Sequence, residues 1–177
     1  MSESLETLVG ESHVGVAVPA GFRAMMGGFP TGVSVVTATD LDGRPWGMTC
    51  SSVCSVTLEP PTLLICLRAA SPTLAALMVR EAFAVNLLHE RAQTTAELFA
   101  SGDPDRFERV GWRCADGAAG PHLWEDAHAV ADCRVADTML VGDHMVVFGE
   151  VLRVVRPAPD GRPLLYGLRR YSRWPHS

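Results

Sequence analysis

Small hydroxyl and thiol side chains crowd into the stretch Gly47-Met48-Thr49-Cys50-Ser51-Ser52. Hydroxyls and free backbone N–H groups can hydrogen-bond the edge of a flat ring that carries heteroatoms, and Gly47 leaves room for a close approach. The same groups can instead bond their own backbone or a neighbouring strand, and spacing alone slightly favours that structural role. The stretch is therefore a candidate ring-binding site with a structural alternative.

A second candidate lies at the start of an expected helix, where Ser71 and Thr73 follow Arg68. A helix N-terminus presents unpaired N–H groups and a partial positive charge, which together favour a phosphate group. Most serines at this position only cap their helix. The segment is thus a candidate phosphate site, with simple capping as the alternative.

Three more polar residues could contact a ligand. His144 follows Gly142-Asp143 at the start of a strand, where a structural hydrogen bond is its commoner role. Arg106 could meet a second phosphate or pair with Asp103 at the surface. Asn86 lies inside an apolar strand, so its amide needs buried partners from a ligand or from backbone.

Several familiar chemistries are excluded. The sequence contains no G-x-S-x-G and no G-x-G-x-x-G, and the stretch from His89 to Gln93 lacks the second histidine of a zinc protease site. No clustered carboxylates suggest a glycosidase. All 15 basic residues are arginine, which rules out Schiff-base chemistry and a phosphate-binding lysine.

Composition predicts one globular domain of 177 residues. The net charge of -5 argues against nucleic-acid binding, and no apolar run is long enough to span a membrane. The five cysteines are odd in number, form no C-x-x-C pair and follow no export signal, which predicts reduced thiols in the cytoplasm and no metal site. Residues 1–20 read as a flexible lead-in, and residues 21–177 as the domain.

The expected elements are mostly strands. Asp40-Leu41-Asp42-Gly43 supplies turn chemistry between the first two strands, and Asp160-Gly161 suggests a hairpin. Without regular strand–helix alternation, the pattern predicts a closed or split antiparallel barrel with short inserted helices. We expect strands over residues 33–39, 46–52, 62–67, 83–88, 127–137, 144–155 and 164–171, and helices over residues 22–28, 72–80 and 91–100.

Taken together and in order, motifs from residue 22 to residue 174 resemble those of the flavin reductase family. These motifs are Phe22-Arg23, Phe29-Pro30-Thr31-Gly32-Val33, Gly47-Met48-Thr49-Cys50-Ser51-Ser52, Ser55-Val56, Pro60-Pro61, Ser71-x-Thr73, Phe83-Ala84-Val85-Asn86, Asp105-Arg106-Phe107, Gly142-Asp143-His144 and residues 166–171. The resemblance implies a mainly β, Greek-key-like split β-barrel of the FMN-binding type. It also implies flavin bound at a homodimer interface.

The resemblance further assigns residues to two ligands. A flavin would be held by Thr31, Thr49, Cys50, Ser51, Ser52, Cys66, Leu67, Arg68, Ser71, Thr73, Asn86, Leu87 and Arg106. Reduced nicotinamide would be met by His144, with Tyr171 nearby. Cys50 departs from the family, which often has alanine there, and changes the polarity near the ring face.

The implied activity is that of an NAD(P)H:flavin oxidoreductase. It would reduce FAD or FMN with NADH or NADPH and supply the reduced flavin to a partner monooxygenase. No side chain need be catalytic, because hydride passes between the two cofactors. Two alternatives stay open: a flavoprotein that retains FMN or FAD and reduces its own substrate, and a flavin-binding module without turnover, against which His144 argues mildly.

Overall fold

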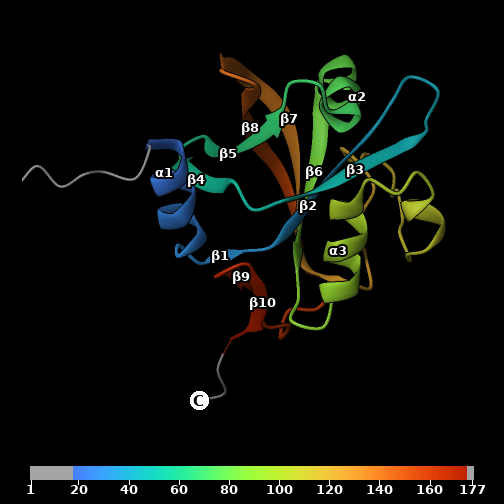
Figure 1. The fold of residues 1–177 in the computed structure, drawn as a ribbon. Coiled ribbons are helices and arrows are strands. Elements are labelled where there is room, and N and C mark those ends of the chain that lie inside the picture. Colours follow the sequence, from blue (N-terminus) through green and yellow to red (C-terminus); the bar gives the residue numbers. More distant parts are fainter. Residues whose placement is uncertain (1–17, 175–177) are drawn as a thin grey trace, which may run out of the picture.

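The computed structural model describes residues 18–174, which fold into two antiparallel sheets and three α-helices (Figure 1). The seven-stranded sheet has the order β3-β2-β6-β7-β8-β5-β4, and the smaller sheet the order β1-β9-β10. The strands are β1 (Thr31–Gly32), β2 (Ser34–Thr39), β3 (Pro45–Cys50), β4 (Val53–Leu58), β5 (Pro61–Arg68), β6 (Ala82–Leu88), β7 (Ala127–Val141), β8 (His144–Val155), β9 (Leu164–Gly167) and β10 (Arg170–Arg173). The helices are α1 (Val18–Gly27), α2 (Pro72–Arg80), α3 (Gln93–Ser101) and the short 3₁₀ helix η1 (Arg106–Glu108).

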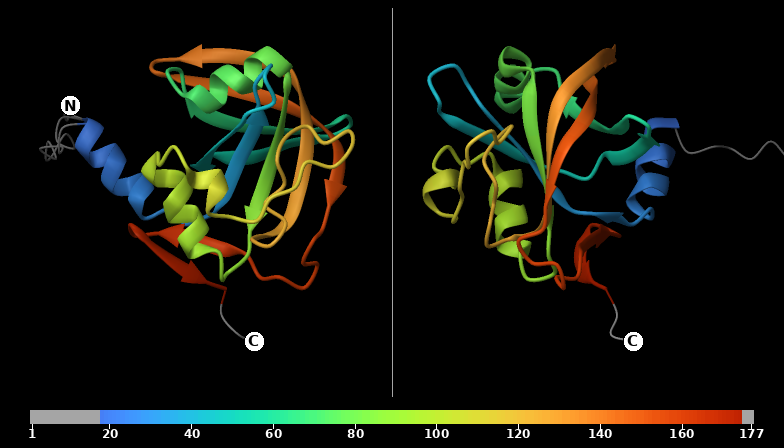
Figure 2. Two further views of the ribbon diagram at one scale, coloured as in Figure 1. Left: turned by 90° about the vertical axis from the view of Figure 1, so that its right-hand side faces the viewer. Right: turned by 180° about the vertical axis from the view of Figure 1, so that it is seen from behind.

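The large sheet curls into a barrel (Figure 2). Its two edge strands, β3 and β4, are consecutive in the chain and joined only by Ser51-Ser52. The Cys66 amide donates to the Ser52 carbonyl at 3.2 Å, which ties this junction to β5. The chain is therefore a split β-barrel, as expected.

Strand β2 is buried on both faces, which explains its continuous β-branched run. Val36 packs inside the barrel with Ile65, Leu67 and Phe83. On the other face, α3 and the segment of residues 103–126 cover the strand. That second core contains Val33, Val35, Leu88, Ala96, Phe99, Leu123 and Leu164.

Helix α2 sits against the inner core through the buried side chains of Leu74 and Leu77. Pro72 occupies its first turn, which suits the fixed backbone angle of proline. Ser71 is the N-cap residue of this helix, as predicted. Its hydroxyl makes no cap hydrogen bond, however, and lies 3.2 Å from the Met48 sulfur.

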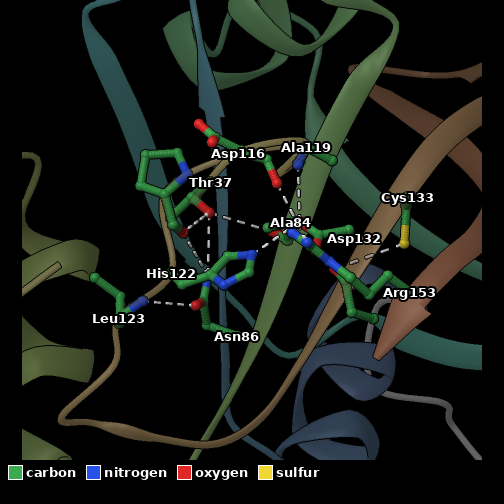
Figure 3. Close-up of polar contacts among 12 residues, drawn as sticks. Thr37, Ala84, Asn86, Asp116, Ala119, His122, Leu123, Asp132, Cys133 and Arg153 are labelled. Carbon is green, nitrogen blue, oxygen red and sulfur yellow. Dashed lines mark hydrogen bonds and ion pairs between the residues drawn. The ribbon is translucent and has the colours of Figure 1, made fainter. Parts of the chain in front are cut away.

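A buried polar network fastens the segment of residues 103–126 to the sheet (Figure 3). Asp132 Oδ1 lies 2.8 Å from His122 Nε2 and accepts from the Ala119 amide, while Asp132 Oδ2 accepts from Arg153 Nε at 2.7 Å. Thr37 donates to the Pro121 carbonyl at 2.6 Å. These bonds fix a long connection whose only named element is the short 3₁₀ helix η1.

The structure corrects several predicted elements. Helix α1 begins at Val18, inside the predicted lead-in, of which residues 1–17 lie outside the described part of the chain. Strand β4 was not predicted, and β3 ends at Cys50 rather than residue 52. The last predicted strand is two strands, because Leu168 and Arg169 take positive φ and turn the chain back. The turn near Asp160-Gly161 joins β8 to β9, which lie in different sheets and form no hairpin.

Within residues 18–174, no helix is long and apolar enough to cross a membrane. The same residues contain no group of three His, Cys, Asp or Glu side chains placed to hold a metal ion.

Candidate functional site

Two adjoining pockets, of about 430 and 340 Å³, lie where the end of α1, strand β1 and the Ser51-Ser52 junction meet β9. We call them together the α1–β1 pocket. Its volume falls in the range of small-molecule sites. The lining residues are Met26, Phe29, Pro30, Thr31, Gly32, Ser34, Ser51, Ser52, Val53, Cys54, Leu64, Leu87 and Tyr166.

Thr31 carries a buried hydroxyl for which the described residues supply no hydrogen-bond partner. A buried hydroxyl without a partner costs free energy, so this oxygen is suited to a ligand atom. Ser51 and Ser52 line the same pocket and are exposed. The walls are otherwise mainly apolar, with Phe29 and Tyr166 as the aromatic members. The pocket thus matches a flat, largely apolar ligand with polar edges.

The pocket wall continues along the outer face of β5. Leu64 lines the pocket, and the alternation of β5 puts Cys66 and Arg68 on the same outward face. Ser71, at the start of α2, is the third residue after the strand. A continuous strip therefore runs from the predicted ring site to the predicted phosphate site.

Five predicted flavin residues have side chains that face the protein interior. The Thr49 hydroxyl donates to the Ala96 carbonyl at 2.6 Å, which holds α3 against β3. Leu67 and Thr73 are buried, the first in the barrel core. Cys50 is buried too, and burial raises the pKa of its thiol to about 11. Only the backbone of these residues is free to meet a ligand.

Asn86 is the fifth of these residues, and its amide is fully used within the protein. Its Nδ2 donates to the Val35 carbonyl at 3.2 Å and to Thr37 Oγ1 at 3.0 Å, and its Oδ1 accepts from the Leu123 amide at 2.8 Å. Asn86 therefore belongs to the network that fastens residues 103–126. The neighbouring Leu87 does line the α1–β1 pocket.

Arg106 lies in η1, half-buried and next to Asp103. Burial lowers the pKa of its guanidinium, an effect that the Asp103 charge opposes. Its neighbour Phe107 packs edge-on against Phe99 of α3. The 3₁₀ turn is thereby held against the helix that covers β3.

His144 and Tyr171, the two predicted nicotinamide residues, are not brought together within one chain. His144 begins β8, opposite Arg68 in register, and its Nδ1 lies 2.8 Å from Asp143 Oδ1. Tyr171 lies in the smaller sheet, with its ring centroid 5.1 Å from that of Tyr166. The β7–β8 turn, which precedes His144, and strand β10, which contains Tyr171, lie at opposite ends of the barrel (Figures 1 and 2).

Sequence reasoning missed several lining residues, among them Met26, Cys54 and Leu64. Alternation along two paired strands would have placed Cys54 and Leu64 on one face, but β4 was not recognised as a strand. Tyr166 was noted only as the start of a matching segment.

Residues 26–175 match the family model described as "Flavin reductase like domain". The chain belongs to the flavin reductase family. The predicted family, the split-barrel fold and the flavin reductase activity are therefore confirmed, while the roles of individual residues stay predictions.

Named relatives agree with this assignment. A flavin reductase (NADPH) from Lentzea aerocolonigenes is 52% identical over 155 residues, or 88% of this chain and 89% of that protein. The reductase subunit HsaB of a flavin-dependent monooxygenase from Mycobacterium tuberculosis is 37% identical over 149 residues, or 84% and 78%. A solved NADH:FAD oxidoreductase from Streptomyces globisporus, in complex with NAD and FAD fragments, is similar with a TM-score of 0.81 and 32% identity, covering 89% of this chain and 93% of that one.

Proposed function

We propose that this flavin reductase takes free FAD or FMN as an exchangeable substrate, reduces it with NADH or NADPH, and releases it to a partner monooxygenase. The α1–β1 pocket, with its unpartnered Thr31 hydroxyl, is the observation that carries the proposal. The proposal of a monooxygenase partner is supported by the relative named as the reductase subunit of a flavin-dependent monooxygenase. Because NAD(P)H is the reductant, we place the reaction in the cytoplasm.

The residues present fit a flavin. In our proposal the ring system lies in the α1–β1 pocket, with its polar edge toward Thr31 and the Ser51-Ser52 backbone. The ribityl chain follows Cys66 along β5, and the phosphate meets Arg68 and the first turn of α2. Ser71, Arg106 and the backbone of Thr49, Asn86 and the other inward-facing residues complete the predicted set.

The bound flavin and nicotinamide supply the chemistry, a hydride transfer from nicotinamide C4 to flavin N5. The protein has to hold the rings together and keep water away. The pocket lining suits this task, because Phe29, Val53 and Leu64 are apolar and no carboxylate or histidine is among the residues that line it.

The nicotinamide would be met by His144 and Tyr171. Since these residues lie at opposite ends of one barrel, a site that uses both needs two protomers. This supports the proposal of a homodimer with flavin near its interface.

The test is steady-state kinetics with protein stripped of flavin. NADH or NADPH oxidation, followed by absorbance, should be absent without flavin and should saturate as FAD or FMN is added. Reduced flavin should also be trapped by a second flavin-binding protein across a dialysis membrane under anaerobic conditions.

The two alternatives give different results. Stoichiometric flavin that survives extensive dialysis, with no stimulation by added flavin, would support a flavoprotein acting on its own substrate. Flavin binding without any oxidation of NADH or NADPH would support a non-catalytic module.

A further inference from the structure

A pocket outside the α1–β1 pocket lies between helix α2 and the β2–β3 turn. It has a volume of about 320 Å³ and is lined by Asp40, Leu41, Asp42, Trp46, Pro72, Ala75, Ala76 and Val79. We call it the Trp46 pocket. None of the predicted flavin or nicotinamide residues lines it.

We propose that the Trp46 pocket binds the adenosine part of FAD, so that this enzyme prefers FAD to FMN. The inference rests on the proposed function, which places the flavin phosphate at the first turn of α2. Pro72 is the first residue of that helix and also lines the Trp46 pocket. A flavin whose phosphate reaches Ser71 would thus direct its next groups toward this pocket.

The indole of Trp46 forms a rigid wall. Its Nε1 donates to Asp40 Oδ2 at 2.9 Å, and the Arg44 guanidinium lies 4.8 Å from the ring centroid. Both contacts hold the ring in place before any ligand arrives. A purine base gains most from an aromatic surface that is already ordered, because little entropy is lost on binding.

Small side chains on α2 form the opposite wall. Pro72, Ala75, Ala76 and Val79 follow the spacing of one helix face, and the two alanines leave the space that makes the pocket. The space between helix and indole is therefore an open, mainly apolar groove with Asp40 and Asp42 in its lining, a surface on which a flat base could lie. A phosphate-terminated flavin such as FMN has nothing to place there.

The polar groups at the rim suit an adenosine. Both oxygens of Asp40 are occupied, Oδ1 by the amides of Asp42 and Arg44 and Oδ2 by Trp46. Asp42 lines the same pocket and is exposed, so its carboxylate can accept a hydrogen bond from an adenine amino group or a ribose hydroxyl. Arg44 at the same rim offsets the acidic charge near a pyrophosphate.

The test measures the Kd of FAD and of FMN by calorimetry with stripped protein and no nicotinamide. Wild-type protein should bind FAD about tenfold more tightly than FMN, the size of one base–aromatic contact. Ala75→Phe, at an exposed helix position, fills the pocket and should raise the Kd of FAD about tenfold while leaving that of FMN unchanged. Trp46→Ala should act in the same direction.

Met78→Phe is the matched control, since Met78 is exposed on the same helix but does not line the pocket. It should change neither Kd. Equal affinities for FAD and FMN in the wild type, or an Ala75→Phe variant that shifts both flavins alike, would overturn the adenosine site while both flavins are still reduced. Absence of NAD(P)H oxidation with either flavin would instead overturn the proposed reductase function.

Discussion

Two threonines of the predicted site use the same hydroxyl in opposite ways. Thr31 Oγ1 is buried and has no partner among the described residues, whereas Thr49 Oγ1 donates to the Ala96 carbonyl at 2.6 Å. The first hydroxyl is available to a ligand, and the second is already used for folding. The two residues are of the same type and both belong to the predicted flavin set. Only the structure therefore shows which hydroxyl is available to a ligand.

Thr31→Val keeps the shape of the side chain and removes the hydroxyl. We expect it to raise the Kd of flavin about fivefold to tenfold, the effect of losing one hydrogen bond worth about 1–1.5 kcal/mol. Thermal stability should stay equal or rise slightly, because a buried hydroxyl without a partner is lost. Calorimetric titration and thermal unfolding measure the two effects.

Thr49→Val is the matched control. It should lower the free energy of unfolding by about 1 kcal/mol through loss of the bond to α3, with little change in flavin affinity. If instead Thr49→Val weakens flavin binding and Thr31→Val does not, our reading of the pocket is wrong.

His144→Ala should weaken the use of NADH or NADPH by the enzyme. The His144 side chain is half-exposed, and its Nδ1 lies 2.8 Å from Asp143 Oδ1. Loss of one polar contact worth about 1–2 kcal/mol should lower kcat/KM for NADH or NADPH about fivefold to thirtyfold. Flavin affinity should stay almost unchanged. A variant with normal NADH kinetics and weakened flavin binding would contradict this role.

At the scale of elements, the long connection of residues 103–126 depends on Asp132 of β7. Burial would raise the pKa of Asp132, but hydrogen bonds from His122, the Ala119 amide and Arg153 outweigh it and leave the pKa below its usual value. The ionised carboxylate therefore stabilises the folded state above the unfolded pKa. That stabilisation is lost as the pH falls through the lower, folded pKa.

Asp132→Asn should lower the free energy of unfolding at pH 7 by about 3 kcal/mol, because it breaks a buried charged network. Urea unfolding at pH 7 and at about pH 3 tests the sign, since the difference from wild type should shrink in acid. Asp137→Asn, at an exposed position on the same strand, is the control and should have little effect. A difference of equal size at both pH values would show that the charge is not responsible.

Much of the fold could be predicted because long apolar runs and turn chemistry are local signals. The predicted bounds of β8 and α2 agree with the structure, and Gly43 takes the positive φ that its turn requires. Strand β4 was missed because its exposed Cys54 and Ser55 lack a regular apolar alternation. At the turn Leu168-Arg169, both residues take positive φ although neither is glycine or asparagine, so their residue types do not predict the turn.

The candidate site could be predicted from sequence patterns less completely than the fold. The α1–β1 pocket joins the end of α1, two short strands and the β3–β4 junction, which are far apart in the sequence. The roles of Asn86 and Thr37 depend on the carbonyl of Pro121, whose position no local pattern predicts. Family resemblance names the right segments, but it does not say which side chain of each segment faces the ligand.

At the scale of the whole molecule, α1 packs only weakly against the rest of residues 18–174, and the Leu168 amide donates to the Gly27 carbonyl at its last turn. None of its residues is buried, and Phe22 and Met25 are 60% and 64% exposed. The helix projects from the side of the barrel (Figure 2). Its last turn supplies Met26 to the α1–β1 pocket. A second copy of this chain that covered α1 would therefore also border the flavin.

We predict a homodimer that α1 helps to hold together. Sedimentation at micromolar concentration should give twice the monomer mass of 19.0 kDa, and C2 symmetry is the commonest arrangement for such an assembly. Met25→Glu places a charge on the apolar face of α1 and should shift the protein toward monomer, with flavin reduction falling in parallel. Met78→Glu, at an exposed apolar position of α2 outside both pockets, is the control and should remain dimeric. Wild-type protein that sediments as a monomer and keeps full activity would rule the homodimer out.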